Sequence, residues 1–365
     1  MTLHKSPHRV ELAYSLVRAP SAGDWVLHPL FQMLDAVERR GSISAAARML
    51  GLSYRHVWGE LKRWEEEFGR LLIIWEKGQK AKLTEFGQKL LWAERQAQSR
   101  LAPQIASLRA DLERAFGMAF NDEAHVLMVN ASHDDALSAF REHVSDSGLF
   151  LDIRFSGGLD ALTALAEGRA SVAGFHCPIA GQVHEEIRQK LLTQYRSLLL
   201  NKRCEGIEFA RREVGLIIEP GNPLKLRGLE DLLTGRYRFV NRPVGTGTRL
   251  FLDAWLDHRG KTGKDLEGYR YEEPSHSAVA EAVRVGAADA GLGLAHSAES
   301  RGLGFIPLFE EGYLLALHRD GLNELSLKAL VVALQDPIWH LKIGGLIGYR
   351  PISDGGLVPV SEILL

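Results

Sequence analysis

The sequence predicts an α/β protein with a small, mainly helical N-terminal domain. Two patterns support this fold class. Residues 41–69 contain two short helical segments joined by a tight turn, and from residue 125 onward short apolar strands alternate with helical segments. Such alternation is typical of a parallel sheet covered by helices. The chain of 365 residues is longer than one hydrophobic core usually supports, so we expect two or three domains.

The first helices are predicted from capping residues and apolar spacing. Residues 1–23 mix histidine, proline and charged residues, and we expect them to form an N-terminal arm. A helix follows near residues 28–40, with its apolar residues on one face. Ser44 is then expected to cap a second helix, and Gly51 to end it. The three alanines at 45–47 leave room for another helix to cross closely.

A third helix is predicted to begin after a capping serine at position 53. Its buried face is indicated by apolar residues at helical spacing, namely Val57, Leu61, Trp64 and Phe68. Two helices joined in this way form either a plain hairpin within a core or a helix-turn-helix, whose second helix enters the major groove of DNA. In the second interpretation the DNA-contacting residues of this helix are Ser53, Tyr54, Arg55, His56, Trp58 and Lys62.

A hairpin is predicted directly after the third helix. It consists of an apolar strand at 71–75, a basic tip at 76–82 and a return at 83–87. Lys77, Lys80 and Lys82 on this hairpin are expected to lie near DNA phosphates and to give salt-sensitive affinity. The hairpin favours DNA binding over a hairpin of helices within a core. We place the winged helix-turn-helix domain at residues 24–88.

A long helix is predicted over residues 85–120, capped by Thr84 and interrupted only at Pro103. An apolar stripe runs along it and includes Leu91, Leu101, Ile105, Leu108, Leu112 and Phe116. Such a stripe finds no partner inside a small winged domain and usually packs against a second copy of itself. We therefore expect a homodimer or homotetramer with a linker and dimerisation helix at 89–122. The alternative is packing against the downstream domain of the same chain.

The N-terminal segment resembles the winged helix of ModE-type (molybdate-responsive) and LysR-type bacterial regulators. LSYRHVW is similar to the ModE recognition helix, and WEEEFG together with LTEFGQKLL is similar to both families. The resemblance covers about a fifth of the chain. It implies a transcription factor that binds double-stranded operator DNA, with RNA polymerase as a further candidate partner.

Polar loops follow the first strands of the C-terminal part. A strand at 125–130 runs into Ser132, His133 and Asp134, and a strand at 150–155 runs into residues 156–158. A third strand is predicted at 170–175. A helix starts after each of the first two loops. Backbone N–H groups at helix N-termini attract anions, so these loops are candidate ligand sites.

The best ligand loop of the sequence spans residues 241–249, between a strand at 237–240 and a helix at 250–258. Its two glycines allow a tight fold around an oxyanion, and its two threonines add hydroxyl donors. Arg249 adds a positive charge at the helix start. The loop does not match a dinucleotide fingerprint, because a third glycine and an acidic residue at the end of a following strand are missing.

The motifs GLIIEPGNP, VNRPVGTGTR, EPSHS and GAADAGLG resemble the periplasmic-binding-protein-like effector domain that is fused to helix-turn-helix regulators and to molybdopterin-biosynthesis proteins. The resemblance spans about 125–340. It implies a bilobal domain at 123–365, with lobe I at about 124–206 and 304–365, lobe II at about 207–303, and a ligand in the cleft. The implied effector-binding residues are Ser132, His133, Asp134, Ser156, Gly157, Gly158, Gly245, Thr246, Gly247, Thr248, Arg249, His276 and Tyr313.

The expected effector is a small anion, most of all molybdate or tungstate. ModE-type regulators hold molybdate in a small β-barrel domain that this chain lacks, so only the bilobal half suggests this ligand. A small organic acid or a molybdopterin-related compound is the alternative. A hydrolytic enzyme built on Asp134, Asp289, His133 and His276 is a second alternative, but no nucleophile elbow, metal spacing or paired-carboxylate motif supports it. We therefore predict no catalytic residues, no metal site and no cofactor.

Composition sets limits on partners and location. The net charge of −2 confines any affinity for nucleic acid to local basic surfaces. Cys177 and Cys204 are the two cysteines, which provide no disulfide framework or metal-ligand cluster. The first twenty residues lack an apolar run of signal-peptide length, and no later stretch reaches about 18 apolar residues. We expect a soluble cytoplasmic protein without a membrane partner.

Overall fold

The computed structural model describes residues 28–74, 80–120, 125–145, 147–199, 204–318, 324–352 and 356–363. The chain forms two compact units, Met1–Gln98 and Ser99–Leu365, named here the N-terminal and C-terminal units. The predicted arm at 1–23 and most of the predicted hairpin tip, including Lys77, lie outside the described residues. No described helix combines the length and the apolar composition needed to cross a membrane.

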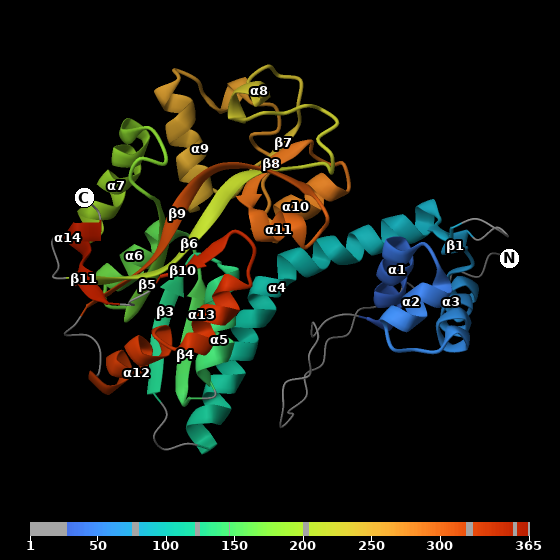
Figure 1. Ribbon diagram of the computed structural model, residues 1–365, viewed down its shortest axis with the longest axis horizontal. Coiled ribbons are helices and arrows are strands. Elements are labelled where there is room, and N and C mark those ends of the chain that lie inside the picture. The colour runs from blue at the N-terminus through green and yellow to red at the C-terminus, as the bar shows by residue number, and fades with distance from the viewer. Residues whose placement is uncertain are drawn as a thin grey trace, which may run out of the picture. The chain divides into compact units, whose positions relative to one another are not determined.

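The N-terminal unit is a three-helix domain with a short hairpin (Figure 1). Buried apolar residues from all three helices and from the hairpin form one core. The hairpin strands pair antiparallel, with Ile73 opposite Leu83. The elements are α1 (Pro29–Arg40), α2 (Ile43–Met49), α3 (Tyr54–Phe68), β1 (Ile73–Ile74), β2 (Lys82–Leu83) and the start of α4 (Glu85–Phe120).

Two of the three predicted helix caps are confirmed, and one is wrong. Ser53 Oγ accepts a hydrogen bond from the His56 N–H at 3.2 Å, and Thr84 Oγ1 accepts one from the Gly87 N–H at 3.0 Å. The cap of α2 is Ser42 and not Ser44. Ser42 has extended backbone angles and accepts from the Ala45 N–H at 3.4 Å, because the helix already begins at residue 43.

The long helix α4 continues without interruption from Glu85 to Phe120. The predicted interruption at Pro103 is therefore wrong. A proline removes one backbone donor and can bend a helix, but it need not end one.

Lobe I of the C-terminal unit contains a parallel three-stranded segment in the order β4-β3-β5. The strands are β3 (His125–Ala131), β4 (Leu149–Phe155) and β5 (Val172–Pro178), and the lobe I helices are α5 (Asp135–Ser145), α6 (Gly158–Ala166), α7 (Glu185–Leu199), α12 (Glu324–Leu334) and α13 (Pro337–Gly344). The three predicted strands and the loops after the first two are confirmed.

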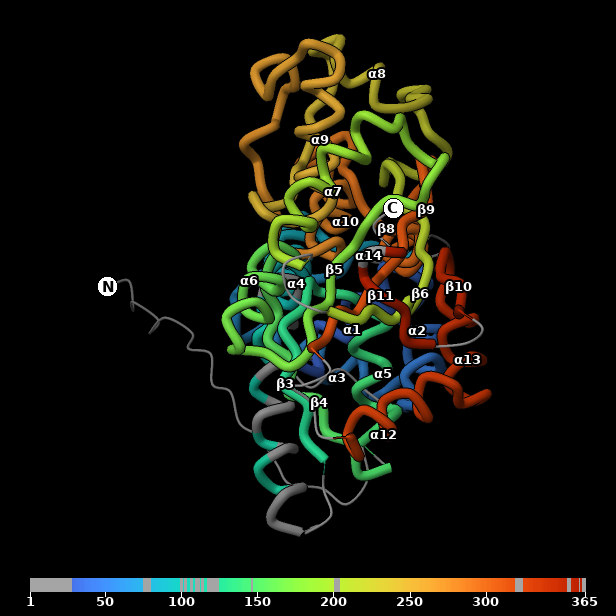
Figure 2. The backbone as a smooth tube through the Cα atoms, turned by 90° about the vertical axis from the view of Figure 1, so that its left-hand side faces the viewer, coloured from blue at the N-terminus to red at the C-terminus, as the bar shows by residue number. Residues whose placement is uncertain are grey.

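Lobe II is smaller and pairs β7 in parallel with β8. Figure 2 shows its helices α8, α9 and α10 above α5 and α12 of lobe I. Its elements are α8 (Leu229–Leu232), β7 (Phe239–Val240), α9 (Gly247–His258), a 3₁₀ turn (Gly263–Asp265), α10 (His276–Arg284), β8 (Ala290–Leu294) and α11 (Ala295–Glu299).

Two long antiparallel strands, β6 (Cys204–Ile218) and β9 (Gly304–His318), join the lobes. They form the centre of one sheet with the order β4-β3-β5-β9-β6-β8-β7, and β10 (Tyr349–Pro351) and β11 (Leu357–Pro359) also pair with β6. The short α14 (Val360–Ile363) follows. The expectation of a parallel sheet holds only at its two ends, because the chain passes into lobe II on β6 and returns on β9 in the opposite direction. The register of β6 shifts between Val214 and Gly215.

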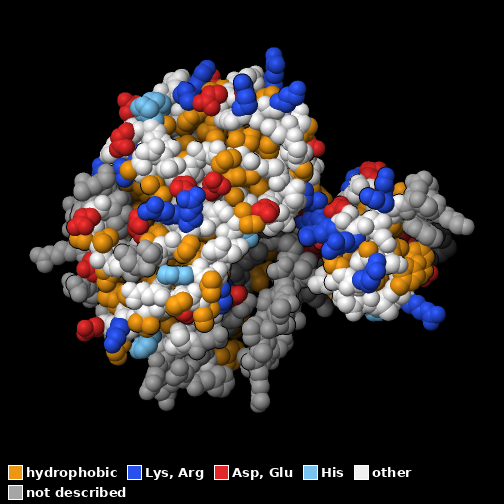
Figure 3. All heavy atoms as spheres, viewed as in Figure 1, with side chains coloured by type: hydrophobic (Ala, Val, Ile, Leu, Met, Phe, Trp, Pro, Cys, Tyr) orange, Lys and Arg blue, Asp and Glu red, His pale blue; other side chains and the backbone are white. Residues whose placement is uncertain are grey.

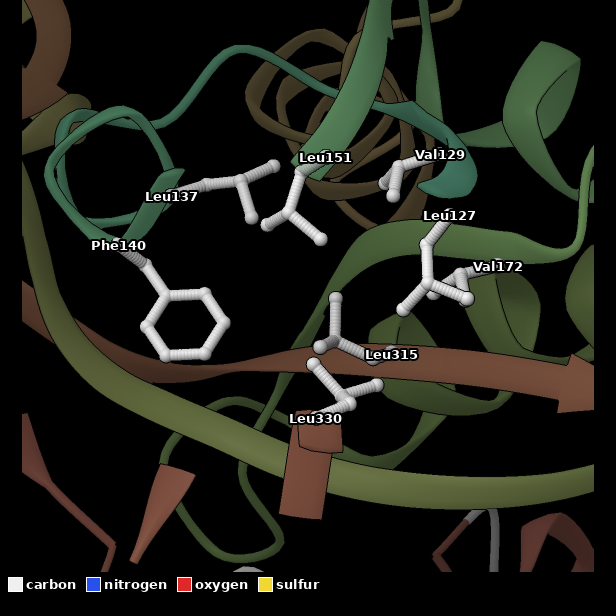
Figure 4. A pocket seen from close by; sticks show the side chains of 8 residues that line it. All are labelled: Leu127, Val129, Leu137, Phe140, Leu151, Val172, Leu315 and Leu330. Carbon is white, nitrogen blue, oxygen red and sulfur yellow. The ribbon is translucent and has the colours of Figure 1, made fainter. Parts of the chain in front are cut away.

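The core of lobe I contains a small apolar cavity (Figure 4). Its volume is about 10 Å³, which is at the lower limit for a single water molecule. The lining side chains are Leu127, Val129, Leu137, Phe140, Leu151, Val172, Leu315 and Leu330. This cavity is a packing defect and is too small for a ligand.

Candidate functional site: a DNA-binding face and a cationic site between two lobes

The predicted recognition helix α3 presents an exposed polar surface at its start. Ser53, Tyr54, Arg55 and His56 are exposed, whereas Trp58 and Lys62 are half-buried. The Tyr54 ring stacks parallel to the Trp58 ring with centroids 6.4 Å apart, and the Lys62 amine lies 4.8 Å from the Trp58 ring. Tyr54, Arg55 and His56 are thus the residues most free to reach a ligand.

Glu65 anchors α3 to the hairpin, a role that the sequence analysis missed. Its carboxylate is buried and accepts hydrogen bonds from the N–H groups of Leu72 at 2.8 Å and Ile73 at 3.2 Å. It also forms an ion pair with Lys62 at 2.6 Å. The signal in the sequence is its position four residues after the buried Leu61. On the hairpin, Lys80 and Lys82 are exposed, as expected for phosphate contacts.

The predicted loops of the two lobes meet in the C-terminal unit. A Cβ atom on Gly157 would lie 2.8 Å from the carbonyl oxygen of Gly245, and one on Gly247 would lie 3.6 Å from Cβ of His176. Gly245 has a φ of +89°, a conformation that favours glycine. The glycines at 157 and 245 therefore allow lobe I and lobe II to touch.

A buried ionic cluster lies beneath these loops. Arg212 on β6 binds Asp134 at 2.5 Å and Glu311 at 2.6 Å, and the Tyr349 hydroxyl donates to Asp134 at 2.9 Å. Burial opposes the ionisation of Asp134, but the hydrogen bond with His176 and the charge of Arg212 hold its pKa well below the usual value. Asp134 also accepts from the Leu137 N–H at the start of α5. Although it was predicted to bind the effector, its carboxylate is already used to fix the loop.

His176 connects this cluster to the loop after β3. Its Nδ1 lies 2.7 Å from Ser132 Oγ, and its Nε2 lies 3.5 Å from the Asp134 carboxylate. Its ring stacks on Tyr313 at 4.1 Å, and the Tyr313 hydroxyl donates to the Ser132 carbonyl. Burial and the charge of Arg212 lower the pKa of His176, which keeps the ring neutral. His176 was missed because it is 44 residues from Ser132 in the chain.

Ser132, His176 and Asp134 have the composition of a hydrolytic triad. However, Arg212 and Tyr349 already bind the Asp134 carboxylate, and all three triad side chains are buried. The negative charge of the Asp134 carboxylate is therefore compensated by Arg212 and is not available to His176. We assign this arrangement to loop positioning.

Arg242 carries unpaired donors between the lobes. It is 5% exposed, its Nη2 donates to the Pro274 carbonyl at 3.0 Å, and its Nε and Nη1 have no hydrogen-bond partner among the described residues. Burial and the charge of Arg212 lower the pKa of Arg242 to about 9. Asp135 acts on Arg242 only through its charge, and no carboxylate among the described residues pairs with Arg242. A buried cation without an ion-pair partner is costly, so this arrangement favours a bound anion. The sequence analysis quoted this residue in its best ligand loop but did not select it.

His276 at the start of α10 lies within range of the same charges. It is buried, and its Nδ1 has no partner among the described residues. Burial, followed by the charges of Arg242 and Arg212, lowers its pKa well below the usual value. The half-buried His133, whose ring lies 4.9 Å from Phe155, has a lowered pKa mainly because of burial. The charges of Arg242 and Arg212 thus act on buried imidazoles from both lobes, whose neutral form they favour.

Arg249 does not provide the expected free charge at the start of α9. Its guanidinium binds Asp253 at 3.0 Å and Glu272 at 2.7 Å, and it stacks on the Tyr269 ring at 4.2 Å. Both carboxylates compensate its charge, and the contact of Arg249 with the effector stays a prediction. Arg242, in the same loop, instead offers donors that have no hydrogen-bond partner among the described residues.

The remaining predicted loop residues have local partners. The Thr246 hydroxyl donates to the Pro243 carbonyl at 2.8 Å, and Thr248 is buried in the first turn of α9. Ser156 makes only a long 3.4 Å contact with the Gly157 carbonyl, and Gly158 packs near Phe175. Neither Gly157 nor Thr246 forms a side-chain cap, so the first N–H groups of α6 and α9 are not capped by those side chains.

Both parts of the chain match known protein families. Residues 139–335, more than half of the chain, match the PBP superfamily domain, and residues 29–88 match the bacterial regulatory helix-turn-helix protein of the LysR family. The architecture is that of a DNA-binding regulator with a PBP-like domain. The chain belongs to the PBP superfamily and carries a LysR-family helix-turn-helix domain. LysR-family regulators are in general not enzymes, and this confirms the prediction of a regulator without catalytic residues. The LysR part of the resemblance is confirmed, and the ModE part stays a prediction.

Two curated proteins are similar to parts of the chain. The uncharacterized protein YvgK of Bacillus subtilis (strain 168) is 30% identical over 207 residues, which cover 56% of this chain and 64% of that protein. The chain thus spans less than two thirds of the length of this relative. An uncharacterized protein in the ferredoxin 2Fe-2S gene 5′ region of Clostridium pasteurianum is 29% identical over 110 residues, which cover 30% of this chain and 97% of that protein.

Two solved structures are also similar to the chain. The full-length LTTR LysG from Corynebacterium glutamicum with bound effector Arg is 22% identical, with a TM-score of 0.39, and covers 88% of this chain and 99% of that one. ArgP from Mycobacterium tuberculosis is 15% identical, with a TM-score of 0.35, and covers 84% of this chain and 95% of that one.

Proposed function

We propose that this protein is a transcription regulator that binds operator DNA as a homodimer or homotetramer and responds to a small anion held between its two lobes. The observation that carries the effector part is Arg242, a buried cation at the junction of the lobes whose Nε and Nη1 have no hydrogen-bond partner among the described residues. An anion there would supply the missing charge and the missing acceptors.

The DNA-binding part is supported by the exposed start of α3 and by the hairpin. Tyr54, Arg55 and His56 are exposed where a recognition helix meets base edges. Lys80 and Lys82 are exposed beside it and are suited to phosphate contacts. Base contacts would give sequence preference, and the lysines would give general affinity.

The oligomer is supported by an uncovered apolar stripe on α4. Leu101 and Leu112 are each 37% exposed and Leu108 is 63% exposed, although all three lie on one long helix at intervals of seven and four residues, which place them on one face. A stripe of this kind favours a second copy of the helix as its partner over the downstream domain of the same chain.

The effector is proposed to be an oxyanion of the molybdate or tungstate type. Arg242 and His276 of lobe II and Ser132 of lobe I are buried and offer polar groups from both lobes, which suits a small anion. A small organic acid or a molybdopterin-related compound is the second candidate, favoured by the mixed imidazole and guanidinium chemistry. An anion that contacts both lobes would favour their closed arrangement, and closure would then alter DNA binding.

A thermal-shift screen tests the effector. The full-length protein is heated with molybdate, tungstate, sulfate, phosphate, formate or small organic acids. One class of these anions, molybdate and tungstate under the proposal, should raise the melting temperature of the protein. Arg242→Gln should remove that shift, yet be at least as stable as the parent without anion, because it removes an unpaired buried charge. A shift that survives in Arg242→Gln would place the anion elsewhere.

A further inference from the structure

A group of metal-ligand side chains spans the two lobes at a distance from the anion site. Helices α7 of lobe I and α9 of lobe II lie side by side (Figure 1). His184 directly precedes α7, Glu186 lies in its first turn, and His258 is the last residue of α9. One ligand atom of each residue lies within 4.8 Å of the others.

The three side chains already converge without an ion. His258 Nδ1 lies 2.8 Å from Glu186 Oε2, and the ring centroids of His184 and His258 are 4.3 Å apart. Figure 3 shows histidine and acidic side chains together on the surface over this edge. The neighbouring Lys190 forms an ion pair with Asp257 at 2.6 Å, so its positive charge is compensated.

Two imidazoles and one carboxylate are a ligand set for divalent transition metals. Zinc binds His nitrogen at about 2.0–2.1 Å and carboxylate oxygen at about 2.0–2.2 Å, and three protein ligands leave a fourth position for water. The donor atoms must therefore approach one another further, which exposed side chains on a helix end can do by rotation about their own bonds. Copper, nickel and zinc all suit imidazole ligands.

We propose that His184, Glu186 and His258 form a binding site for a divalent transition-metal ion of the zinc type. Two ligands belong to lobe I and one to lobe II, so the complete site exists only when α7 and α9 lie together. A bound ion would link the lobes and stabilise their closed arrangement. The sequence analysis predicted no metal site because His258 is 72 residues from Glu186 in the chain.

The test uses the tag-free full-length protein after removal of metals with EDTA. Titration with Zn²⁺ alone should show one equivalent bound, and Co²⁺ should give the visible absorption of a low-coordinate site. His184→Ala, Glu186→Gln and His258→Ala should each weaken Zn²⁺ binding at least tenfold. His296→Ala, which changes a half-buried histidine on α11, should bind like the parent.

The outcome for His258→Ala decides whether the ion bridges the lobes. Zn²⁺ should raise the melting temperature of the parent and not that of His258→Ala. Equal Zn²⁺ binding by the parent and His258→Ala, or no binding by the parent, would overturn the proposal. This site does not depend on the proposed anion, and His258→Ala should keep any anion-induced shift that Arg242 supports.

Discussion

Arg212, Arg242 and Arg249 are buried arginines of the C-terminal unit, and Arg242 differs from the other two because no carboxylate among the described residues pairs with it. Arg212 is bound by Asp134 and Glu311, and Arg249 by Asp253 and Glu272. Among the described residues, Arg242 donates to one carbonyl only, and its Nε and Nη1 have no hydrogen-bond partner. Unlike Arg212 and Arg249, Arg242 therefore has donors left for a ligand.

The imidazoles around Arg242 predict that anion binding is coupled to protons. The pKa values of His133, His176 and His276 are all lowered, in each case first by burial. Without an anion, the unfolded chain therefore binds more protons below pH about 6.5, so stability falls as pH decreases below that value. An anion favours the imidazolium form and raises these pKa values.

Anion affinity should consequently increase as pH falls from about 8 to about 6. Calorimetry at pH 7 in two buffers with different ionisation enthalpies measures the protons taken up on binding. A positive number is expected. Zero uptake would mean that the imidazoles do not face the anion.

Two substitutions in the N-terminal unit separate base contacts from phosphate contacts. Arg55→Ala should cost about 1–3 kcal/mol on a cognate site and reduce sequence preference. Lys80→Ala should weaken binding to all duplexes and flatten the salt dependence. Fluorescence anisotropy on cognate and random DNA distinguishes the two. Equal losses on both DNAs for Arg55→Ala would refute its base contact.

At the scale of elements, Glu65 holds the recognition helix against the hairpin. Glu65→Ala would leave the buried N–H groups of Leu72 and Ile73 without an acceptor, and each unsatisfied group costs roughly 1–3 kcal/mol. The free energy of unfolding of the N-terminal unit should fall by about 2 kcal/mol or more. Urea titration measures the loss. The exposed Glu66→Ala is the matched control, and an equal effect of both would contradict the anchoring role.

The stripe on α4 predicts how the protein assembles. Leu108→Glu places a charge in the proposed helix pairing and should produce monomers that keep anion binding but lose tight operator binding. Gln88→Glu adds the same charge at an exposed position of α4 that, at 3.6 residues per turn, lies on the opposite side of the helix from Leu108, and it should leave the oligomer intact. Light scattering that shows the same mass for Leu108→Glu and the parent would exclude the stripe as the interface.

Local sequence patterns predicted most helices and strands. They could not predict contacts between residues that are far apart in the chain. Caps such as Ser53 and Thr84 act within three residues, so the sequence reveals them directly. The antiparallel pairing of β6 with β9 joins segments about 100 residues apart, and the alternation of strands and helices cannot reveal it. The same limit hid the contact of Tyr349 with Asp134 and the ion pair of Arg249 with Glu272.

At the scale of the C-terminal unit, both candidate ligand sites lie across the junction of the lobes, and β6 and β9 are continuous through it. Ligands that contact both lobes can therefore change their equilibrium without breaking the sheet. Binding energy is converted into closure only if the loops can approach each other. The loops can approach because Gly157 has no side chain. A Cβ atom at this position would point at the Gly245 carbonyl.

Gly157→Ala should hold the lobes apart, because the added Cβ would lie 2.8 Å from the Gly245 oxygen. Backbone strain is not the cause, since Gly157 has a φ of −65° that alanine adopts readily. Anion affinity should fall about tenfold, or about 1.4 kcal/mol, and the decrease in radius of gyration on anion binding should be lost. Calorimetry and small-angle scattering measure the two effects. Gly344→Ala is the matched control, because a Cβ there meets nothing within 4 Å. Parent-like affinity and compaction in Gly157→Ala would show that the effector does not act by bringing these loops together.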